Sequence, residues 1–169
     1  CDERLTWAIG TFRETNDQGF GQGNGELIGT ARITGIPWLA DSSHFLHLGV
    51  SMSHREFGDK GTQFKARSGL HLAPSFADTA NIAADDGSLT GVEALWMMGS
   101  TALQIECMQA RVNNLKFQGS YAQVSHFLNG DQRRFRRAFP QFIRVNPNNN
   151  DGAWELTARV STIDLNDAA

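Results

Sequence analysis

Arginine is the residue type in this sequence with the clearest capacity for binding chemistry. The chain has 12 Arg and only 3 Lys among its 169 residues. A guanidinium group is planar and offers paired N–H donors, so it binds phosphate or carboxylate through two hydrogen bonds at once. The excess of arginine therefore suggests anion binding, although a codon or lineage bias would produce the same composition.

The arginines are most concentrated in the segment Asn129–Asp151, where Phe135, Phe139 and Phe142 are interleaved with them. Arginines among aromatic residues also occur in arms that bind nucleic acid. The chain has a net charge of −3, which favours a local anion-attracting loop over such an arm. A solvated loop that binds nothing stays open as the alternative. The arginines of this segment are Arg133, Arg134, Arg136, Arg137 and Arg144.

Other residue types form no arrangement typical of an enzyme. The five histidines are scattered without metal-ligand spacing, and no Ser–His–Asp or Cys–His motif is recognisable. The adjacent acids Asp85 and Asp86 have no third ligand at coordinating spacing, so we expect them in a solvated turn. The sequence therefore predicts no catalytic residues, no metal and no cofactor.

Alternating apolar and polar residues predict the strands that must position the arginines, because residues two apart on a strand share a face. The clearest alternation is in His44–Arg55, and Gly152–Asp167 shows the same pattern. The second segment has the length of a membrane-crossing strand, about 9–11 residues. We expect the apolar side chains of both segments to face outward: Leu46, Leu48, Val50, Met52, Trp154, Leu156, Ala158 and Val160.

Eight such segments are predicted as strands, and Gly, Asn, Asp and Pro mark the connections between them. We expect Pro37 to end the second strand, because proline cannot donate to a strand ladder. No amphipathic helix of useful length appears, so the eight strands predict an antiparallel meander that closes on itself or belongs to a larger barrel. They are Leu5–Glu14, Glu26–Ile36, His44–Arg55, Thr62–Leu72, Leu89–Met97, Thr101–Val112, Lys116–Leu128 and Gly152–Asp167.

Five segments carry a family resemblance: TGIPW (Thr34–Trp38), HFLHLGVSMSHR (His44–Arg55), HLAPSFADTANIAADD (His71–Asp86), YAQVSHFLNGDQR (Tyr121–Arg133) and GAWELTARVSTIDLND (Gly152–Asp167). In this order, along nearly the whole chain, they resemble the phosphate-selective porin O/P family of Gram-negative outer membranes. Members of that family form 16-stranded trimeric barrels. The resemblance implies that residues 1–169 form a single domain that is an internal portion of such a transmembrane β-barrel, with further strands before Cys1 and after Ala169.

The resemblance implies an outer-membrane porin that passes phosphate or pyrophosphate by passive diffusion. The apolar faces of the strands would contact lipid, and the polar faces would line the channel. Carboxylates on the polar faces, such as Glu93 and Glu155, would hold guanidinium groups in place. The partners implied are small anions, outer-membrane lipid and further copies of the full-length chain in a homotrimer. The basic residues of the matching polar faces are candidates for the anion path: Arg32, Arg55, Lys65, Arg67 and Arg159.

A small soluble or lipid-anchored β-barrel that binds a ligand is the alternative function. It would have to close within eight strands, which small barrels achieve. Cys1 would then be the lipidated residue. Cys1 and Cys107 are the only cysteines, so the sequence has neither a disulfide framework nor a zinc pattern.

Overall fold

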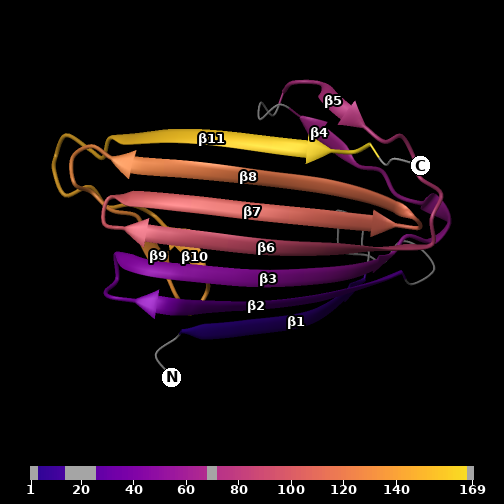
Figure 1. Cartoon of the computed structure of the whole chain (residues 1–169), viewed down its shortest axis with the longest axis horizontal. Coiled ribbons are helices and arrows are strands. Elements are labelled where there is room, and N and C mark those ends of the chain that lie inside the picture. Colours follow the sequence, from indigo (N-terminus) through magenta and orange to yellow (C-terminus); the bar gives the residue numbers. More distant parts are fainter. Residues whose placement is uncertain (1–3, 14–25, 68–71, 167–169) are drawn as a thin grey trace.

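The computed structural model of the protein describes residues 4–13, 26–67 and 72–166, and its main feature is an antiparallel sheet of seven long strands (Figure 1). The strand order is β1-β2-β3-β6-β7-β8-β11. This order confirms the all-β antiparallel meander expected from the sequence. The strands are β1 (Leu5–Arg13), β2 (Leu27–Leu39), β3 (His44–Glu56), β6 (Asp86–Met98), β7 (Thr101–Val112), β8 (Leu115–Phe127) and β11 (Glu155–Asp164).

The shorter elements lie in two long connections of the sheet. The connection from β3 to β6 holds a 3-10 turn, η1 (Gly58–Lys60), and the paired strands β4 (Lys65–Arg67) and β5 (Ser75–Asp78). The connection from β8 to β11 holds the hairpin of β9 (Arg134–Arg136) and β10 (Gln141–Ile143). Across the described part of the chain, no helix has the length and apolar character needed to span a membrane.

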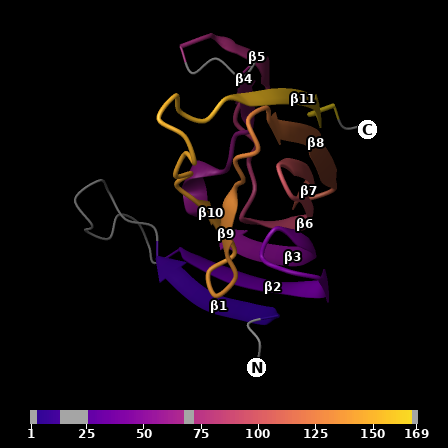
Figure 2. The same cartoon turned by 90° about the vertical axis from the view of Figure 1, so that its left-hand side faces the viewer.

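The sheet is curved, and β9 and β10 lie in its hollow (Figure 2). Side chains of β3 alternate between two faces, as the strand period requires. Phe45 and His47 are buried on one face, whereas Leu48 and Val50 are exposed on the other. The rings of Phe45 and Phe135, which belongs to β9, have centroids 5.2 Å apart. We therefore call the face with Phe45 the concave face, and the opposite face the convex face.

One end of the concave face is covered by the β9–β10 hairpin. The covered residues form an apolar cluster, in which Phe45 and Met97 are each only 1% exposed. Phe135 and Phe142 of the hairpin pack against this cluster, and their own ring centroids are 5.7 Å apart. Burial of these rings holds the hairpin against the sheet, since each aromatic side chain removes a large apolar area from water.

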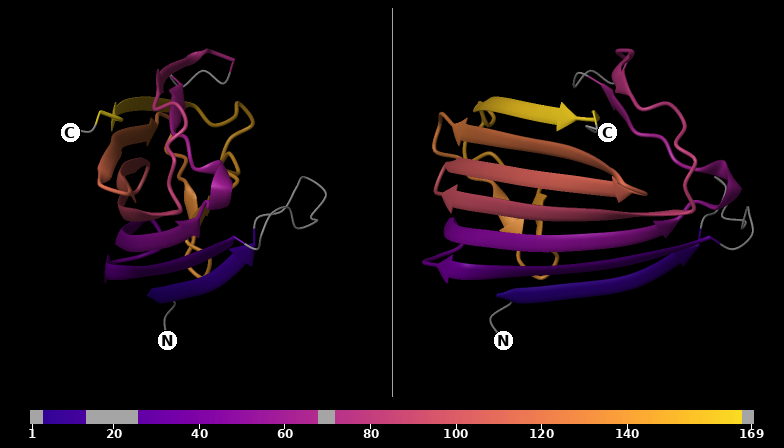
Figure 3. Two further views of the ribbon diagram at one scale, coloured as in Figure 1. Left: turned by 90° about the vertical axis from the view of Figure 1, so that its right-hand side faces the viewer. Right: turned by 45° about the vertical axis from the view of Figure 1, so that its right-hand side comes forward.

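The other end of the concave face is covered by the connection from β3 to β6. Phe64 of this connection packs against Phe117 of β8, with ring centroids 5.1 Å apart, and Val112 is 1% exposed. Beyond this contact, β4 and β5 lie beside the end of β11, clear of the seven-stranded sheet (Figure 3). Both ends of the concave face are therefore apolar and covered.

The predicted fourth strand, Thr62–Leu72, is wrong as a member of the main sheet. Only Lys65–Arg67 is a strand in its described part, and residues 68–71 lie outside the described residues. β3 pairs with β6 directly, from His44↔Met98 to Glu56↔Asp86. The alternation of apolar and polar residues in this segment has another cause. The ring of Phe64 packs on the concave face of the sheet, although the segment is not a strand of that sheet.

Pro37 does not end the second strand as predicted. β2 continues to Leu39, and the register with β3 shifts between Gly35 and Trp38. Proline is tolerated at such an irregularity, where the strand ladder needs no N–H donor. The last predicted strand is shortened, since β11 begins at Glu155.

The convex face carries the apolar side chains predicted to face outward. Leu48 is opposite Ala94, and the same row continues across the sheet to Val160. Leu48, Val50, Met52, Leu156 and Val160 are 44–70% exposed. Arg159 lies on the concave face. It belongs to the row of paired residues that begins at His47 on β3 and passes through Gln104 on β7. The convex face is therefore an exposed apolar surface, and the concave face holds the polar groups.

Candidate functional site

Between its two covered ends, the concave face carries a group of polar side chains that we call the polar belt. Register alone brings them together: Gly49 is opposite Glu93, Glu93 is opposite Glu106, and Glu106 is opposite Tyr121. Each pair belongs to two neighbouring strands of the meander, and six consecutive strands, from β2 to β11, contribute to one surface. The polar belt comprises Arg32, His47, Glu93, Gln104, Glu106, Tyr121 and Arg159.

Arg32 and Glu93 form the central ion pair of the polar belt. Nη2 of Arg32 lies 2.5 Å from Oε1 of Glu93. The two residues are on β2 and β6, so the Glu93 side chain must cross β3, and it does so over Gly49. Nδ1 of His47 is 3.8 Å from the same carboxylate oxygen. The carboxylate thus fixes a guanidinium in the way expected from the sequence.

Tyr121 anchors the other side of the polar belt. Its hydroxyl accepts a hydrogen bond from Nε2 of Gln104 at 2.8 Å. The guanidinium of Arg159 lies over its ring, with the central carbon 3.8 Å from the ring centroid. A cation at this distance from an aromatic face is attracted by the ring quadrupole. The Tyr121 ring therefore gives the Arg159 guanidinium a defined position.

The β9–β10 hairpin forms the roof over part of the polar belt. Phe135, Pro140 and Phe142 of this segment line a cavity together with Arg32 and Glu93. The Phe135 ring meets the His47 ring edge-on, with centroids 5.3 Å apart. A cavity therefore separates the polar belt from the hairpin, with polar groups of the sheet on one side and apolar groups of the hairpin segment on the other.

Charge in the polar belt is nearly balanced. Arg32 and Arg159 contribute positive charge, and Glu93 and Glu106 contribute negative charge. Such a surface attracts an anion weakly, since each guanidinium is offset by a carboxylate on the same face. Within the described residues no three His, Cys, Asp or Glu side chains gather where a metal ion could be held. The near balance of charge means that no strong site for an ion of either sign stands out in the polar belt.

Three of the five candidates for the anion path lie on the concave face of the sheet: Arg32, Arg55 and Arg159. Arg55 follows Ser53 on the same face of β3 and lines a second cavity. Lys65 and Arg67 lie on β4, outside the sheet, so the expectation that they share a wall surface with Arg32 is wrong. Their place in an anion path stays a prediction.

Lys65 is part of a local cluster between β4 and β5. Its Nζ lies 3.6 Å from Oδ2 of Asp78. The backbone N–H of Ala80 donates to Asp78, and this contact, together with Gln63 and Lys65, lowers the pKa of the Asp78 carboxyl below its ordinary value. The cluster holds the β4–β5 pair together by polar contacts.

The arginine-rich segment contains the short β9–β10 hairpin, and the rest of it is turns and irregular chain. Arg133 is held by both oxygens of Glu155, at 2.8 and 2.9 Å, and its guanidinium lies 5.1 Å from the Phe142 ring centroid. Arg134 and Arg136 flank Phe135 and are exposed, so they point away from the sheet that Phe135 contacts. Arg137 is half-buried and Arg144 is exposed. Only Arg133 of the five is thus fixed by an ion pair with the sheet.

His47, Gln104 and Tyr121 of the polar belt were not among the residues singled out by the sequence. Each lies on the polar side of an alternating strand. This position indicates a polar surface, but many other residues share it, so it does not single out these three. Their neighbourhood depends on the register between strands, and register is not visible in the pattern of a single strand.

The protein is similar to known porins. The family model described as "Phosphate-selective porin O and P" matches residues 4–169. The chain is 25% identical over 156 residues to Porin O of Pseudomonas aeruginosa, covering 76% of this chain and 36% of that protein. It is 31% identical over 136 residues to an uncharacterized protein of Caulobacter vibrioides, covering 72% of this chain and 27% of that protein. The chain therefore spans about a third of the length of these relatives.

Proposed function

Because the chain belongs to the phosphate-selective porin O and P family, we propose that it forms part of the wall of an outer-membrane channel through which small anions diffuse passively. The single observation that carries this proposal is the separation of the two faces. Guanidinium groups lie on the concave face, and an exposed apolar surface covers the convex face. This is the distribution that a barrel between lipid and water requires.

The height of the apolar band on the convex face is somewhat below that of the apolar band of an outer-membrane barrel, and this near agreement supports the proposal. The most apolar rows of the convex face lie between two mixed rows. One mixed row has His44, Thr101 and His126 together with Met98 and Leu156, and the other has Thr90, Gln109 and Gln118 together with Met52. Eight residues separate Thr101 from Gln109, which is about 27 Å along a strand and about 20 Å after a tilt near 40°. An outer-membrane barrel has an apolar band of about 25 Å.

The sheet itself is open, which supports a sector of a larger barrel over a small closed one. β1 and β11 are its edges, and in the described residues each pairs on one side only. Long unpaired edges promote association with other strands. We propose that further strands of the full-length protein complete the barrel, that three copies assemble, and that phosphate or pyrophosphate is the substrate class.

The proposed anion path comprises Arg32, Arg55 and Arg159 on the concave face, with Lys65 and Arg67 near one end of it. The arginines on the hairpin would collect anions at the other end. A series of weak sites lets an ion enter and leave, which steady diffusion requires.

The test is made on the full-length protein in planar lipid bilayers. A salt gradient should give a reversal potential of the sign for anion permeation, and phosphate should block chloride current. Phosphate block should weaken in Lys65→Gln/Arg67→Gln if β4 is part of the path, and unchanged block would remove these two residues from it. A reversal potential with the sign for cation permeation would contradict the proposed function as a whole.

A further inference from the structure

We propose that the cavity between Phe57 and Phe64 is a binding site for a small aromatic carboxylate. The inference deepens the proposed function, because it names an amphipathic anion that the concave face would bind. It depends on the geometry of the cavity and on Arg55, and not on conduction.

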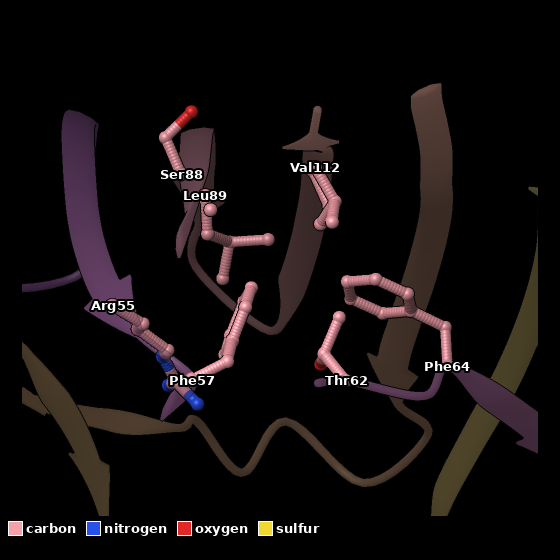
Figure 4. A pocket seen from close by; sticks show the side chains of 9 residues that line it. Arg55, Phe57, Thr62, Phe64, Ser88, Leu89 and Val112 are labelled. Atoms are coloured by element: carbon pink, nitrogen blue, oxygen red, sulfur yellow. The ribbon is translucent and has the colours of Figure 1, made fainter. Parts of the chain in front are cut away.

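The cavity lies where the connection from β3 to β6 crosses the concave face, and its volume is about 110 Å³. Figure 4 shows Phe57 and Phe64 on two sides of it, with Leu89 and Val112 of the sheet above them in the view. An enclosed apolar cavity of about 150 Å³ binds benzene. The present cavity is smaller but partly open, so a ring that enters it would leave its substituent at the mouth.

Both aromatic walls are held in place by the fold. A Cβ on Gly87 would lie 2.8 Å from the Phe57 ring, so this ring is seated directly on the glycine. Phe64 is stacked on Phe117, with ring centroids 5.1 Å apart. Thr62, which lies between the two rings, is bonded to Ile82 by two backbone hydrogen bonds of 2.8 and 2.9 Å. A cavity framed in this way keeps its shape without a ligand, which lowers the entropy lost on binding.

Arg55 supplies the charge at this cavity. It lines the cavity and is exposed, and its side chain runs beside Phe57 (Figure 4). Arg32, Arg133 and Arg159 are engaged with Glu93, Glu155 and Tyr121, respectively. In the described part of the chain, Arg55 forms neither an ion pair nor a side-chain hydrogen bond. Its guanidinium can therefore pair with a carboxylate in the two-bond geometry that this group prefers.

The combination of these groups selects the ligand. Inorganic phosphate would use the guanidinium but leave the aromatic walls without contact. A neutral ring would use the walls but leave the guanidinium unpaired. A ring that bears a carboxylate uses both, and flat rings pack well against aromatic side chains.

The experiment measures binding to the full-length protein in detergent by titration calorimetry, with benzoate as the probe. Acetate has the charge without the ring, and benzamide has the ring without the charge. Benzoate should bind at least about tenfold more tightly than either. Arg55→Gln should weaken benzoate about tenfold or more, since a charge-assisted contact is lost. Phe57→Leu should weaken benzoate while leaving acetate unchanged.

Arg111→Gln is the matched control. Arg111 lies on the opposite face of the sheet and bonds to Gln109, so its loss changes net charge without touching the cavity. An equal effect of Arg111→Gln and Arg55→Gln would overturn the proposal, because it would show general electrostatic attraction. Benzoate binding no tighter than acetate would overturn it as well.

A second measurement needs no variant. Nuclear Overhauser contacts between benzoate ring protons and the methyl groups of Leu89, Val112 and Thr62 are expected in the wild-type protein, and their absence at saturation would overturn the site. Conductance in lipid bilayers tests the proposed anion channel separately from the proposed binding site for an aromatic carboxylate. Benzoate binding to a protein that shows no anion permeation would contradict the channel and leave the site standing.

Discussion

The Glu93 side chain lies across Gly49, and this contact places its carboxylate beside Arg32 in the polar belt. A Cβ on Gly49 would lie 2.7 Å from Cγ and Oε1 of Glu93. The absence of a side chain at Gly49 lets the carboxylate pass over β3 and reach Arg32 on β2. One glycine thus makes possible an ion pair between strands that are not neighbours.

Gly49→Ala should therefore destabilise the protein and displace Glu93 from Arg32. Crowding of this kind costs about 1–3 kcal/mol, and the loss should appear in the free energy of unfolding from lipid vesicles. Gly119→Ala is the control, because on the same face a Cβ there would meet only the Thr162 carbonyl oxygen at 3.8 Å. Equal stability of the two variants would contradict the role assigned to Gly49.

Separate neutralisation of the Arg32–Glu93 pair should shift ion selectivity in opposite directions. Glu93→Gln leaves Arg32 unpaired and should raise the ratio of anion to cation permeability. Arg32→Gln leaves Glu93 and Glu106 opposite each other and should lower it. Reversal potentials should show both shifts at 0.1 M salt and weaker shifts at 1 M, since the screening length falls from about 10 Å to about 3 Å. Shifts of the same sign in both variants would exclude the pair from the ion path.

The hairpin arginines should divide into two functional kinds. Arg134→Gln/Arg136→Gln should lower anion conductance at low salt and leave stability within about 0.5 kcal/mol, because both side chains are exposed. Arg133→Gln should destabilise by about 1–2 kcal/mol, since Glu155 would lose both hydrogen bonds. Conductance against salt and unfolding free energy are measured on the same variants. Unchanged low-salt conductance in the double variant would make the hairpin only a structural element.

The turn between β2 and β3 should give stability a dependence on acidic pH. Hydrogen bonds from the Ser43 backbone and hydroxyl, with His44 beside them, lower the pKa of Asp41 to about 2 from 3.8. A carboxyl whose pKa is depressed on folding stabilises the protein above its unfolded pKa, and this stabilisation is lost as the pH falls from about 4 through 2. Asp41→Asn keeps an oxygen acceptor but does not titrate. The stability difference between wild type and Asp41→Asn should shrink over that interval, and a constant difference would contradict the assignment.

The sequence predicts the faces of the strands better than their neighbours. The outward position of Leu48 and the inward positions of Arg32 and Arg159 follow from the period of two, which is local. The prediction of a sheet strand at Thr62–Leu72 is wrong for the same reason. A segment that packs Phe64 against the sheet shows the same local alternation as a strand within the sheet. The contact of Glu93 with Gly49 requires the register of β3 and β6, whose residues are far apart in the sequence. Side-chain period carries no information on register between distant strands.

Leu48 offers the most direct test of the membrane orientation. It is opposite Ala94, which stands midway along β6 between Met98 and Thr90, in the two mixed rows that border the apolar band of the convex face. Leu48 should thus lie near the bilayer midplane, where an arginine costs about 2–4 kcal/mol. Thr90→Arg is the matched control on the same face, because near the interface the cost falls to about 0–1 kcal/mol. Both variants are unfolded from lipid vesicles with denaturant. Equal losses of unfolding free energy for Leu48→Arg and Thr90→Arg would show that the cost of an arginine on the convex face does not depend on depth in the membrane. The porin orientation would then have to be abandoned.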